Sequence, residues 1–195
     1  MSPAPGRRPG LLLAPGAGAD RDQAQLVAVD TAATSAGLTV ERMDFPYRRE
    51  GRRAPDRAPR LIAAVIDEAE ALAARTAPPP YLGGRSMGGR MCSMAVAAGL
   101  PAAGLILISY PLHPPGRPDR MRTEHLPALE VPCLFVSGTR DAFGTPDELE
   151  AATAAIPGPV THHWVEGRDH GLRGSDAEVA GAVVGWVQNL LARAI

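Results

Sequence analysis

The sequence predicts an α/β fold in which six mostly parallel strands form one sheet with helices on both faces. Short apolar runs alternate with longer amphipathic segments along the chain, which is typical of strands joined by crossover helices. Residues 104–109 are apolar without interruption, as expected for a central parallel strand that is buried on both faces. No linker divides the 195 residues, so we expect one domain over residues 1–195, with residues 1–9 flexible.

The first half of the chain is expected to supply three strands and three helices. Gly37 is the stop signal of the first helix, and the strand that follows it is polar enough for a sheet edge. The arginine-rich residues 46–59 are interpreted as a loop. The expected strands are residues 10–14, 38–45 and 80–83, and the expected helices are residues 20–36, residues 61–74 and a helix from Ser86 to about residue 98.

The second half continues with three more strands and two helices that have clear start signals. Thr145 is expected to cap a helix, with Pro146 at its first position and Glu148 completing a capping box. Ser175 and Glu178 form a second capping box before a long amphipathic helix. The expected strands are residues 104–109, 132–137 and 160–165.

The composition excludes several classes of protein. The chain has 20 basic and 21 acidic residues and a net charge of −1, so nothing indicates a nucleic-acid partner. The apolar run at residues 11–13 is too short for the core of a signal peptide, and no segment approaches the roughly 20 apolar residues of a membrane span. We therefore expect a cytoplasmic protein with no membrane partner. Cys92 and Cys133 lie in apolar segments and are expected to be buried free thiols.

The segment Gly84-Arg85-Ser86-Met87-Gly88 is the strongest functional signal in the chain. It matches G-x-S-x-G and stands between an expected strand and an expected helix, which is the context that a nucleophile elbow requires. The tight turn exposes the serine hydroxyl above the sheet, and the glycines remove side chains that would collide with neighbouring backbone. Ser86 is therefore the candidate nucleophile.

The candidate base and acid follow later strands, in the chain order that accompanies this elbow. His170 lies after the last expected strand and is the candidate base, whereas His162 and His163 lie inside that strand. Asp141 follows the preceding strand and is the candidate acid that would orient the imidazole. Asp169 remains an alternative acid, although neighbouring residues rarely place their side chains face to face.

The candidate oxyanion hole combines two backbone amides. One is the N–H of Met87, and the other is expected from Ala17 in the glycine-rich turn after the first strand. Gly16 and Gly18 would let this turn approach a substrate closely. A phosphate-binding loop is the competing interpretation, but the chain has no G-x-x-x-x-G-K-[ST] or G-x-G-x-x-G pattern and no lysine.

Candidate residues for substrate binding lie beside these groups. Gly16 and Arg85 flank the expected site, and Tyr110 and His113 belong to the loop of residues 110–126 that leaves the next strand. Residues 111–132 form the one long irregular segment, and long loops are usually functional. We expect no lid domain and a shallow site. The alternative for this segment is a proline-stiffened surface loop with a buried tyrosine.

A local basic cluster has two interpretations. A solvated, mobile loop is the default, and a site for an anionic substrate or an acidic partner is the alternative. No aromatic platform for single-stranded nucleic acid accompanies the cluster, and no His, Cys or Asp group has the spacing of metal ligands. The cluster consists of Arg48, Arg49, Arg52, Arg53, Arg57 and Arg60.

Several of these segments resemble small α/β hydrolases of the dienelactone-hydrolase-like group. More narrowly, they are similar to the compact subfamily that includes testis-expressed hydrolase relatives and a subunit of a nuclear acetyltransferase complex. The resemblance extends from Leu11 to Leu191. The segments that carry it are residues 14–19, 83–91, 109–118, 137–141 and 169–171.

The resemblance implies an α/β-hydrolase fold with a Ser-His-Asp triad, which falls on Ser86, His170 and Asp141. Two departures stand out. Pro15 occupies a position where the family usually has histidine, and Ser86 stands where dienelactone hydrolases proper use cysteine, so their substrate does not transfer.

Together these observations predict a serine hydrolase that cleaves small carboxylic esters or thioesters through an acyl-enzyme on Ser86. We expect it to need no cofactor and no metal, and to act on a small-molecule acyl substrate as a monomer or homodimer. Peptidase and perhydrolase activities would use the same residues. The alternative from a different class is a catalytically weak interaction module, as for the acetyltransferase-complex relative.

Overall fold

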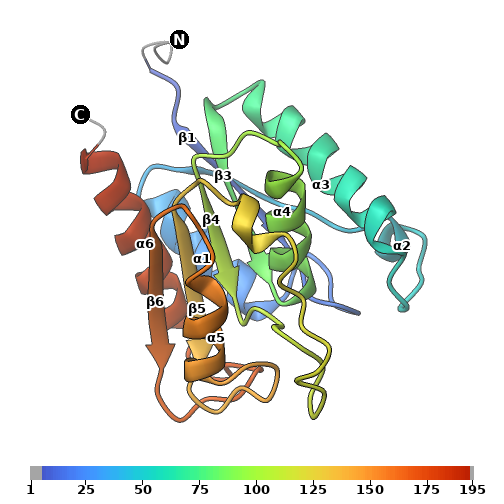
Figure 1. Ribbon diagram of the computed structural model, residues 1–195. Coiled ribbons are helices and arrows are strands. Elements are labelled where there is room, and N and C mark those ends of the chain that lie inside the picture. Colours follow the sequence, from blue (N-terminus) through green and yellow to red (C-terminus); the bar gives the residue numbers. More distant parts are fainter. Residues whose placement is uncertain (1–5, 194–195) are drawn as a thin grey trace.

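One parallel sheet forms the centre of the computed structural model, which describes residues 6–193. Its strands are β1 (Pro9–Ala14), β2 (Thr39–Arg42), β3 (Ala77–Arg85), β4 (Gly104–Ile108), β5 (Cys133–Gly138) and β6 (Val160–Val165). They pair in the order β2-β1-β3-β4-β5-β6, and every neighbouring pair is parallel (Figure 1). The prediction of a six-stranded α/β sheet is confirmed.

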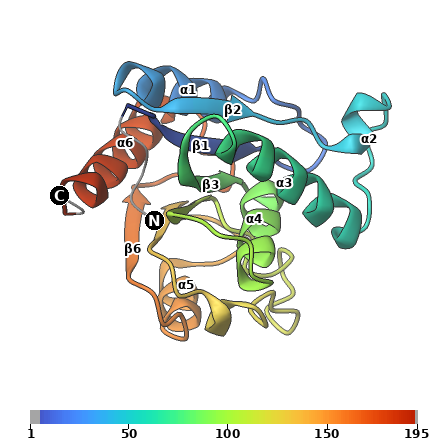
Figure 2. The same cartoon turned by 90° about the horizontal axis from the view of Figure 1, so that it is seen from above.

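Helices cover both faces of this sheet. They are α1 (Ala24–Ser35), α2 (Pro46–Arg49), α3 (Ala58–Ala73), α4 (Met87–Ala97), α5 (Pro146–Thr153), α6 (Asp176–Arg193) and the short 3-10 helix η1 (Leu126–Ala128). The helices α1 and α6 lie on one face, and α3, α4 and α5 lie on the other (Figures 1 and 2). No lid is evident in the described chain.

Alternation along the strands builds two separate apolar cores. In β1, Leu11 and Leu13 pack with the helices α1 and α6, whereas Leu12 and Ala14 pack with α3 and α4. All four side chains are fully buried. Burial of each leucine contributes about 1.5–3 kcal/mol, and because both faces are buried the strand shows an unbroken apolar run.

Several helices and strands begin or end at residues other than the expected ones. The first helix begins at Ala24, because Asp20 forms a turn with the Asp22 N–H instead of a helical cap. The second strand is shorter than residues 38–45, and residues 46–59, expected as a loop, contain α2. The strand β3 begins before residue 80. Its prolines are tolerated where the pairing with β1 is irregular, between the Pro9–Ala77 and Leu11–Tyr81 pairs.

One of the two expected capping boxes forms. The Thr145 hydroxyl accepts from the Glu148 N–H, and the Glu148 carboxylate accepts from the Thr145 N–H at 2.9 Å. The helix α6 begins beside Ser175 as expected. However, the carboxylate of Glu178 lies 3.2 Å from His163 and does not complete a box, so that expectation is wrong.

The remaining general expectations concern the chain ends and the thiols. Of the segment expected to be flexible, residues 1–5 lie outside the described part. Pro9 begins the inner strand β1, and the Arg8 carbonyl before it accepts from the Ala77 N–H. Cys92 and Cys133 are free and buried, as expected. Among residues 6–193, no helix is long and apolar enough to cross a membrane.

The parallel order brings the ends of four strands to one edge of the sheet. Ala17 follows β1, Ser86 follows β3, Asp141 follows β5 and His170 follows β6. In Figure 1 the strand arrowheads and the loops after them lie at the bottom of the molecule. The carboxyl edge of an open α/β sheet is where such folds bind ligands.

Candidate active site

Ser86 occupies a strained turn between β3 and α4. Its φ is +49° and its ψ is −114°, a combination that non-glycine residues rarely adopt. The turn is held by the sheet, because the Ser86 N–H donates to the Ile108 carbonyl at 2.8 Å. This conformation directs the hydroxyl away from the sheet and toward the loops of the carboxyl edge.

Two glycines allow this turn to approach β1. A Cβ atom at Gly84 or at Gly88 would lie 2.2 Å from the carbonyl oxygen of Ala14, which no real side chain could do. The glycines on either side of Ser86 are therefore required by backbone contact. This is the physical basis of the G-x-S-x-G pattern at residues 84–88.

The side chains of Ser86, His170 and Asp141 form one hydrogen-bonded chain. The Ser86 hydroxyl lies 2.9 Å from His170 Nε2. On the other side of the ring, His170 Nδ1 lies 2.8 Å from Asp141 Oδ2 and 3.0 Å from Oδ1. Asp141 is buried, with 3 % of its surface exposed. The carboxylate therefore fixes the tautomer that leaves Nε2 free to accept from the serine.

Two neighbours hold this arrangement in place. The Phe143 N–H donates to Asp141 Oδ1 at 2.8 Å, and the Phe143 ring stacks on the His170 imidazole with centroids 3.9 Å apart. The alternative acid, Asp169, accepts from the Gly171 N–H at 2.9 Å and so caps the loop. Phe143 was missed by the sequence analysis, although its position two residues after Asp141 was a usable signal.

The two residues that carry the candidate oxyanion amides line the same cavity. Ala17 and Met87 both line the cavity that contains Ser86. Met87 is the first residue of α4, where an N–H has no partner within the helix. Neither of these N–H groups donates a hydrogen bond within residues 6–193. Both are free to donate to a bound oxyanion.

This cavity has a volume of about 410 Å³ and lies at the carboxyl edge of the sheet. Its wall is mostly cationic and apolar around the serine and the histidine. The lining residues are Ala17, Arg85, Ser86, Met87, Arg90, Pro111, Arg122, Phe143 and His170.

Arg85, expected to bind substrate, also supports the histidine loop. Its guanidinium donates to the His170 carbonyl at 2.6 Å. Burial lowers the pKa of Arg85, and the charges of Asp141 and Asp169 oppose that shift. Gly16 does not line the cavity. Its N–H donates to the Gln23 side chain, and a Cβ there would lie 3.3 Å from the Arg85 guanidinium.

Tyr110 and His113 do not line the cavity, contrary to the expectation for both residues. Tyr110 is buried against Phe135, and its hydroxyl donates to the Arg122 carbonyl at 2.7 Å. His113 is also buried, with Nε2 3.4 Å from the Glu148 carboxylate. The alternative interpretation of this segment, with a buried tyrosine, agrees better with the structure.

The two cysteines and His162 lie outside the cavity, and the cysteines are buried while His162 is partly buried. Burial raises the pKa of both Cys92 and Cys133 to about 12, so neither is a thiolate near neutral pH. His162 stacks between Phe135 and Trp164. Across residues 6–193, no three His, Cys, Asp or Glu side chains are grouped to hold a metal ion.

Comparison with solved structures supports the fold assignment. Est1E from Butyrivibrio proteoclasticus with bound ferulic acid superimposes with a TM-score of 0.80 at 18% identity, covering 96% of this chain and 91% of Est1E. A dienelactone hydrolase from Anabaena variabilis gives 0.74 at 20% identity, with 95% and 88% covered. An alpha-beta serine hydrolase homologue from Coxiella burnetii gives 0.75 at 18% identity, with 95% and 89% covered.

The sequence itself matches a family model described as "Alpha/beta hydrolase domain" over residues 7–182. That match covers most of the chain, including the elbow and the loops that carry Asp141 and His170. The narrower likeness to the testis-expressed subfamily has no support beyond the sequence segments quoted above. The chain belongs to the alpha/beta hydrolase domain family.

Proposed function

We propose that this protein is a serine hydrolase that cleaves small carboxylic esters or thioesters through an acyl-enzyme on Ser86. The observation that carries this proposal is the continuous hydrogen-bonded chain from Ser86 through His170 to the buried Asp141. A hydroxyl, an imidazole and a carboxylate in this order are the parts that nucleophilic acyl transfer requires.

The reaction follows from the position of each group. His170 Nε2 takes the Ser86 proton as the hydroxyl oxygen attacks the carbonyl carbon of the substrate. The resulting imidazolium is stabilised by Asp141, and it donates its proton to the leaving alcohol or thiol as the acyl-enzyme forms. His170 then takes a proton from water as its oxygen attacks the acyl-enzyme, and it returns this proton to the Ser86 oxygen as the acid is released.

Backbone N–H groups stabilise the negative charge that develops on the substrate oxygen. In each tetrahedral intermediate the former carbonyl oxygen becomes negatively charged, and we assign the Met87 and Ala17 N–H groups as its donors. The N-terminus of α4 adds a partial positive charge below this point. Removing one such donor in other hydrolases costs about 3 kcal/mol of barrier, so both amides are important parts of the proposed machinery.

We also propose that the enzyme works in the cytoplasm on a small-molecule substrate, as a monomer or homodimer. No cofactor enters the proposal, because the serine, the histidine and water complete every step. A cavity of about 410 Å³ without an evident lid suits small acyl groups.

Hydrolysis of p-nitrophenyl esters and of acyl thioesters tests the proposal. We expect wild-type protein to hydrolyse short-chain members, and Ser86→Ala and His170→Gln to lose at least about 10³-fold in kcat/KM. His163→Gln is the matched control, because His163 is a partly exposed histidine outside the cavity and pairs with Glu178.

Full activity in His163→Gln with loss in the other two variants would support the assignment. If folded wild-type protein hydrolyses none of these compounds, the serine-hydrolase proposal fails. The interaction module expected as the alternative would then be the better account.

A further inference from the structure

Two arginines of the cavity beside Ser86 carry positive charge that is paired with no acidic side chain of residues 6–193. Arg90 and Arg122 both line it. Within residues 6–193, neither guanidinium forms an ion pair. Among the described residues, the Arg90 side chain donates no hydrogen bond and its buried Nε has no partner, and Arg122 donates only a long bond to the Pro111 carbonyl at 3.4 Å.

Burial and the positive charge of Arg90 lower the pKa of two neighbouring side chains, Arg122 and His125. The pKa of Arg122 is lowered, first by burial and then by the positive charge of Arg90. Burial and the same Arg90 charge lower the pKa of His125 to about 4. Two guanidinium groups that repel each other at a partly buried wall are costly unless an anion offsets them.

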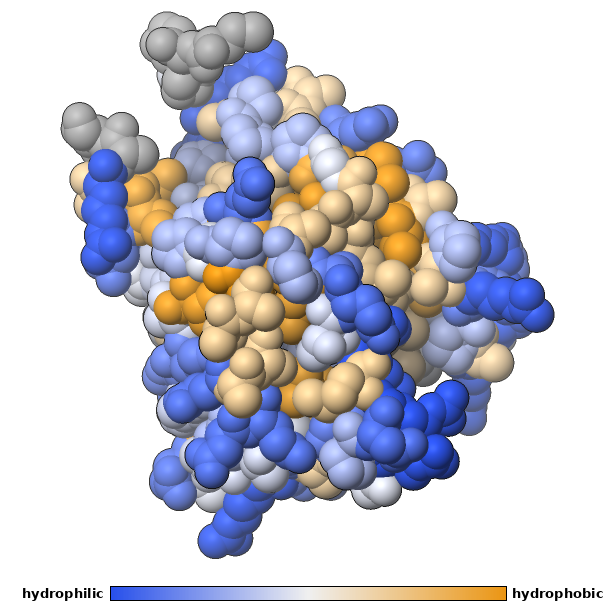
Figure 3. Space-filling model, viewed as in Figure 1, coloured by the Kyte–Doolittle hydropathy of each residue, from blue (hydrophilic) through white to orange (hydrophobic). Residues whose placement is uncertain are grey.

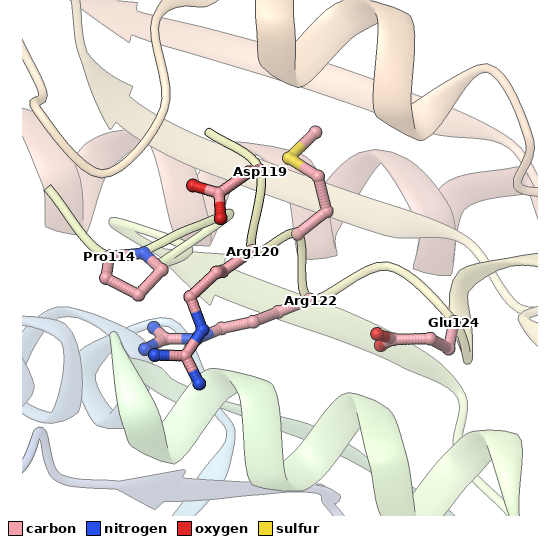
Figure 4. Close-up of a pocket in the computed structure, with 6 residues that line it drawn as sticks. Pro114, Asp119, Arg120, Arg122 and Glu124 are labelled. Atoms are coloured by element: carbon pink, nitrogen blue, oxygen red, sulfur yellow. The ribbon is translucent and has the colours of Figure 1, made fainter. Parts of the chain in front are cut away.

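The acidic residues of the adjoining loop form no ion pair with Arg90 or Arg122 within residues 6–193. A second cavity of about 480 Å³ adjoins the first and shares Arg122 with it. In Figure 4, Arg120 and Arg122 extend to the left, and Glu124 lies at the right with its carboxylate also directed to the left. Glu124 lines this second cavity but forms no ion pair with either arginine within residues 6–193. Asp119 is already paired with Arg117 at 3.2 Å.

The spacing from the nucleophile suits a substrate that reaches both groups. Arg90 follows Ser86 by four residues, so it lies on the same side of α4 about 6 Å further along the helix. Arg122 approaches from the irregular loop across the cavity. Hydrophilic residues gather at the lower right of Figure 3, where this loop lies in Figure 1.

We propose that the substrate carries a carboxylate or phosphate group, bound by Arg90 and Arg122 about one helical turn from the carbonyl that Ser86 attacks. This inference rests on the proposed serine-hydrolase function and adds the substrate class to it. The guanidinium groups would bind the anion by charge-assisted hydrogen bonds, and they would position the carbonyl against the serine hydroxyl.

A set of matched ligands tests the inference without turnover. The amides 4-butyramidobenzoate and 4-butyramidophenyl phosphate are anionic, and 4-butyramidobenzamide is their neutral counterpart. We expect wild-type protein to bind at least one anionic amide about 10- to 100-fold more tightly than the neutral one in calorimetry. The Arg90→Gln, Arg122→Gln double variant should lose this preference.

The matched control is the Arg49→Gln, Arg117→Gln double variant, which removes the same net charge from ion-paired arginines outside the cavity. It should keep the preference. Which anionic amide binds more tightly distinguishes a carboxylate from a phosphate. Equal binding of anionic and neutral amides, or a preference that survives in Arg90→Gln, Arg122→Gln, would overturn the inference.

Measuring ester hydrolysis beside amide binding distinguishes a failure of this inference from a failure of the proposed function. The corresponding butyryl esters, together with phenyl hydrogen adipate and its amide, place the anion on the leaving group or on the acyl chain. Selective binding without hydrolysis of any ester would refute the proposed function and leave the anion site standing. Hydrolysis of neutral and anionic esters at the same rate, with equal binding of the amides, would refute only the anion site.

Discussion

Two groups of arginines at the same edge of the sheet differ in how their charges are balanced. Four of the six arginines in residues 46–60 form ion pairs, whereas Arg90 and Arg122 in the cavity have none within the described chain. The pairs of the segment are Arg48–Asp20, Arg49–Glu68, and Arg52 and Arg60 with both Glu50 and Asp56.

The contrast separates arginines that hold structure from arginines that are available to a ligand. The paired arginines tie α2 and its loop to neighbouring elements, and the Tyr47 hydroxyl accepts from the Gly18 N–H at 3.1 Å in the turn after β1. In the cavity beside Ser86, by contrast, Arg90 and Arg122 form no ion pair and the Ala17 and Met87 N–H groups donate no hydrogen bond within residues 6–193. An arginine-rich sequence by itself therefore says little about binding.

The largest effect should come from the buried carboxylate that bonds to His170. Asp141→Asn keeps the shape but no longer fixes the His170 tautomer, and we expect kcat/KM to fall on the order of 10³- to 10⁴-fold. The thermal midpoint should change little by comparison. Asp169→Asn is the matched control and should retain activity within about threefold, since Asp169 bonds its own loop. Equal losses in the two variants would mean that the acid is misassigned.

The next effect concerns the turn that carries the nucleophile. Gly84→Ala and Gly88→Ala each force a Cβ to 2.2 Å from the Ala14 carbonyl. We expect unfolding free energy to drop by about 3 kcal/mol or more, measured by urea denaturation. Gly185→Ala in α6 is the control, because a Cβ there has no atom within 4 Å. That change should stabilise the protein by about 0.5–1 kcal/mol.

A smaller effect is expected for Arg85, and it distinguishes this residue from the other two cavity arginines. Arg85→Gln removes the guanidinium that donates to the His170 carbonyl at 2.6 Å. Since this bond positions the base, we expect kcat/KM to fall about 10-fold for neutral and anionic esters alike. Loss confined to anionic esters would instead assign Arg85 to substrate binding, together with Arg90 and Arg122.

The smallest effect should come from the ion-paired arginines of residues 46–60. Arg49→Gln breaks the pair with Glu68, in which the Arg49 side chain is half exposed. Because such surface pairs contribute little, we expect less than about 1 kcal/mol of lost stability and unchanged ester hydrolysis. A large loss of activity for this variant would show that the segment takes part in substrate recognition, and the contrast between the two groups would disappear.

Much of the fold and of the candidate site could be predicted because local patterns carry the information. Apolar runs identified the buried strands, the alternation with helices placed the more polar ones, and a parallel sheet brings the residues after them to one edge. Ser86, Asp141 and His170 each follow a different strand, so their meeting follows from topology. Boundaries were less predictable, since the prolines at the start of β3 obscured its first residues.

The lining of the cavity was harder to predict, for physical reasons. Arg90 was recognisable in principle, because a residue four positions after the nucleophile lies on the same side of the helix. Arg122 comes from a segment without periodicity, so only the fold shows where it lies. Tyr110 was expected at the site, but the chain turns at Ser109, which has a φ of +49°, and the ring packs into the core against Phe135.

The central claim is that His170 and Asp141 activate Ser86, and covalent labelling with a fluorophosphonate probe tests it most directly. Peptide mass spectrometry would locate the label in wild-type protein, Ser86→Ala and His170→Gln, with heat-denatured protein as the control. We predict one label, on Ser86, that is absent from Ser86→Ala and from denatured protein and strongly slowed in His170→Gln. Folded wild-type protein that remains unlabelled at Ser86, or labelling that His170→Gln leaves unchanged, would contradict the claim.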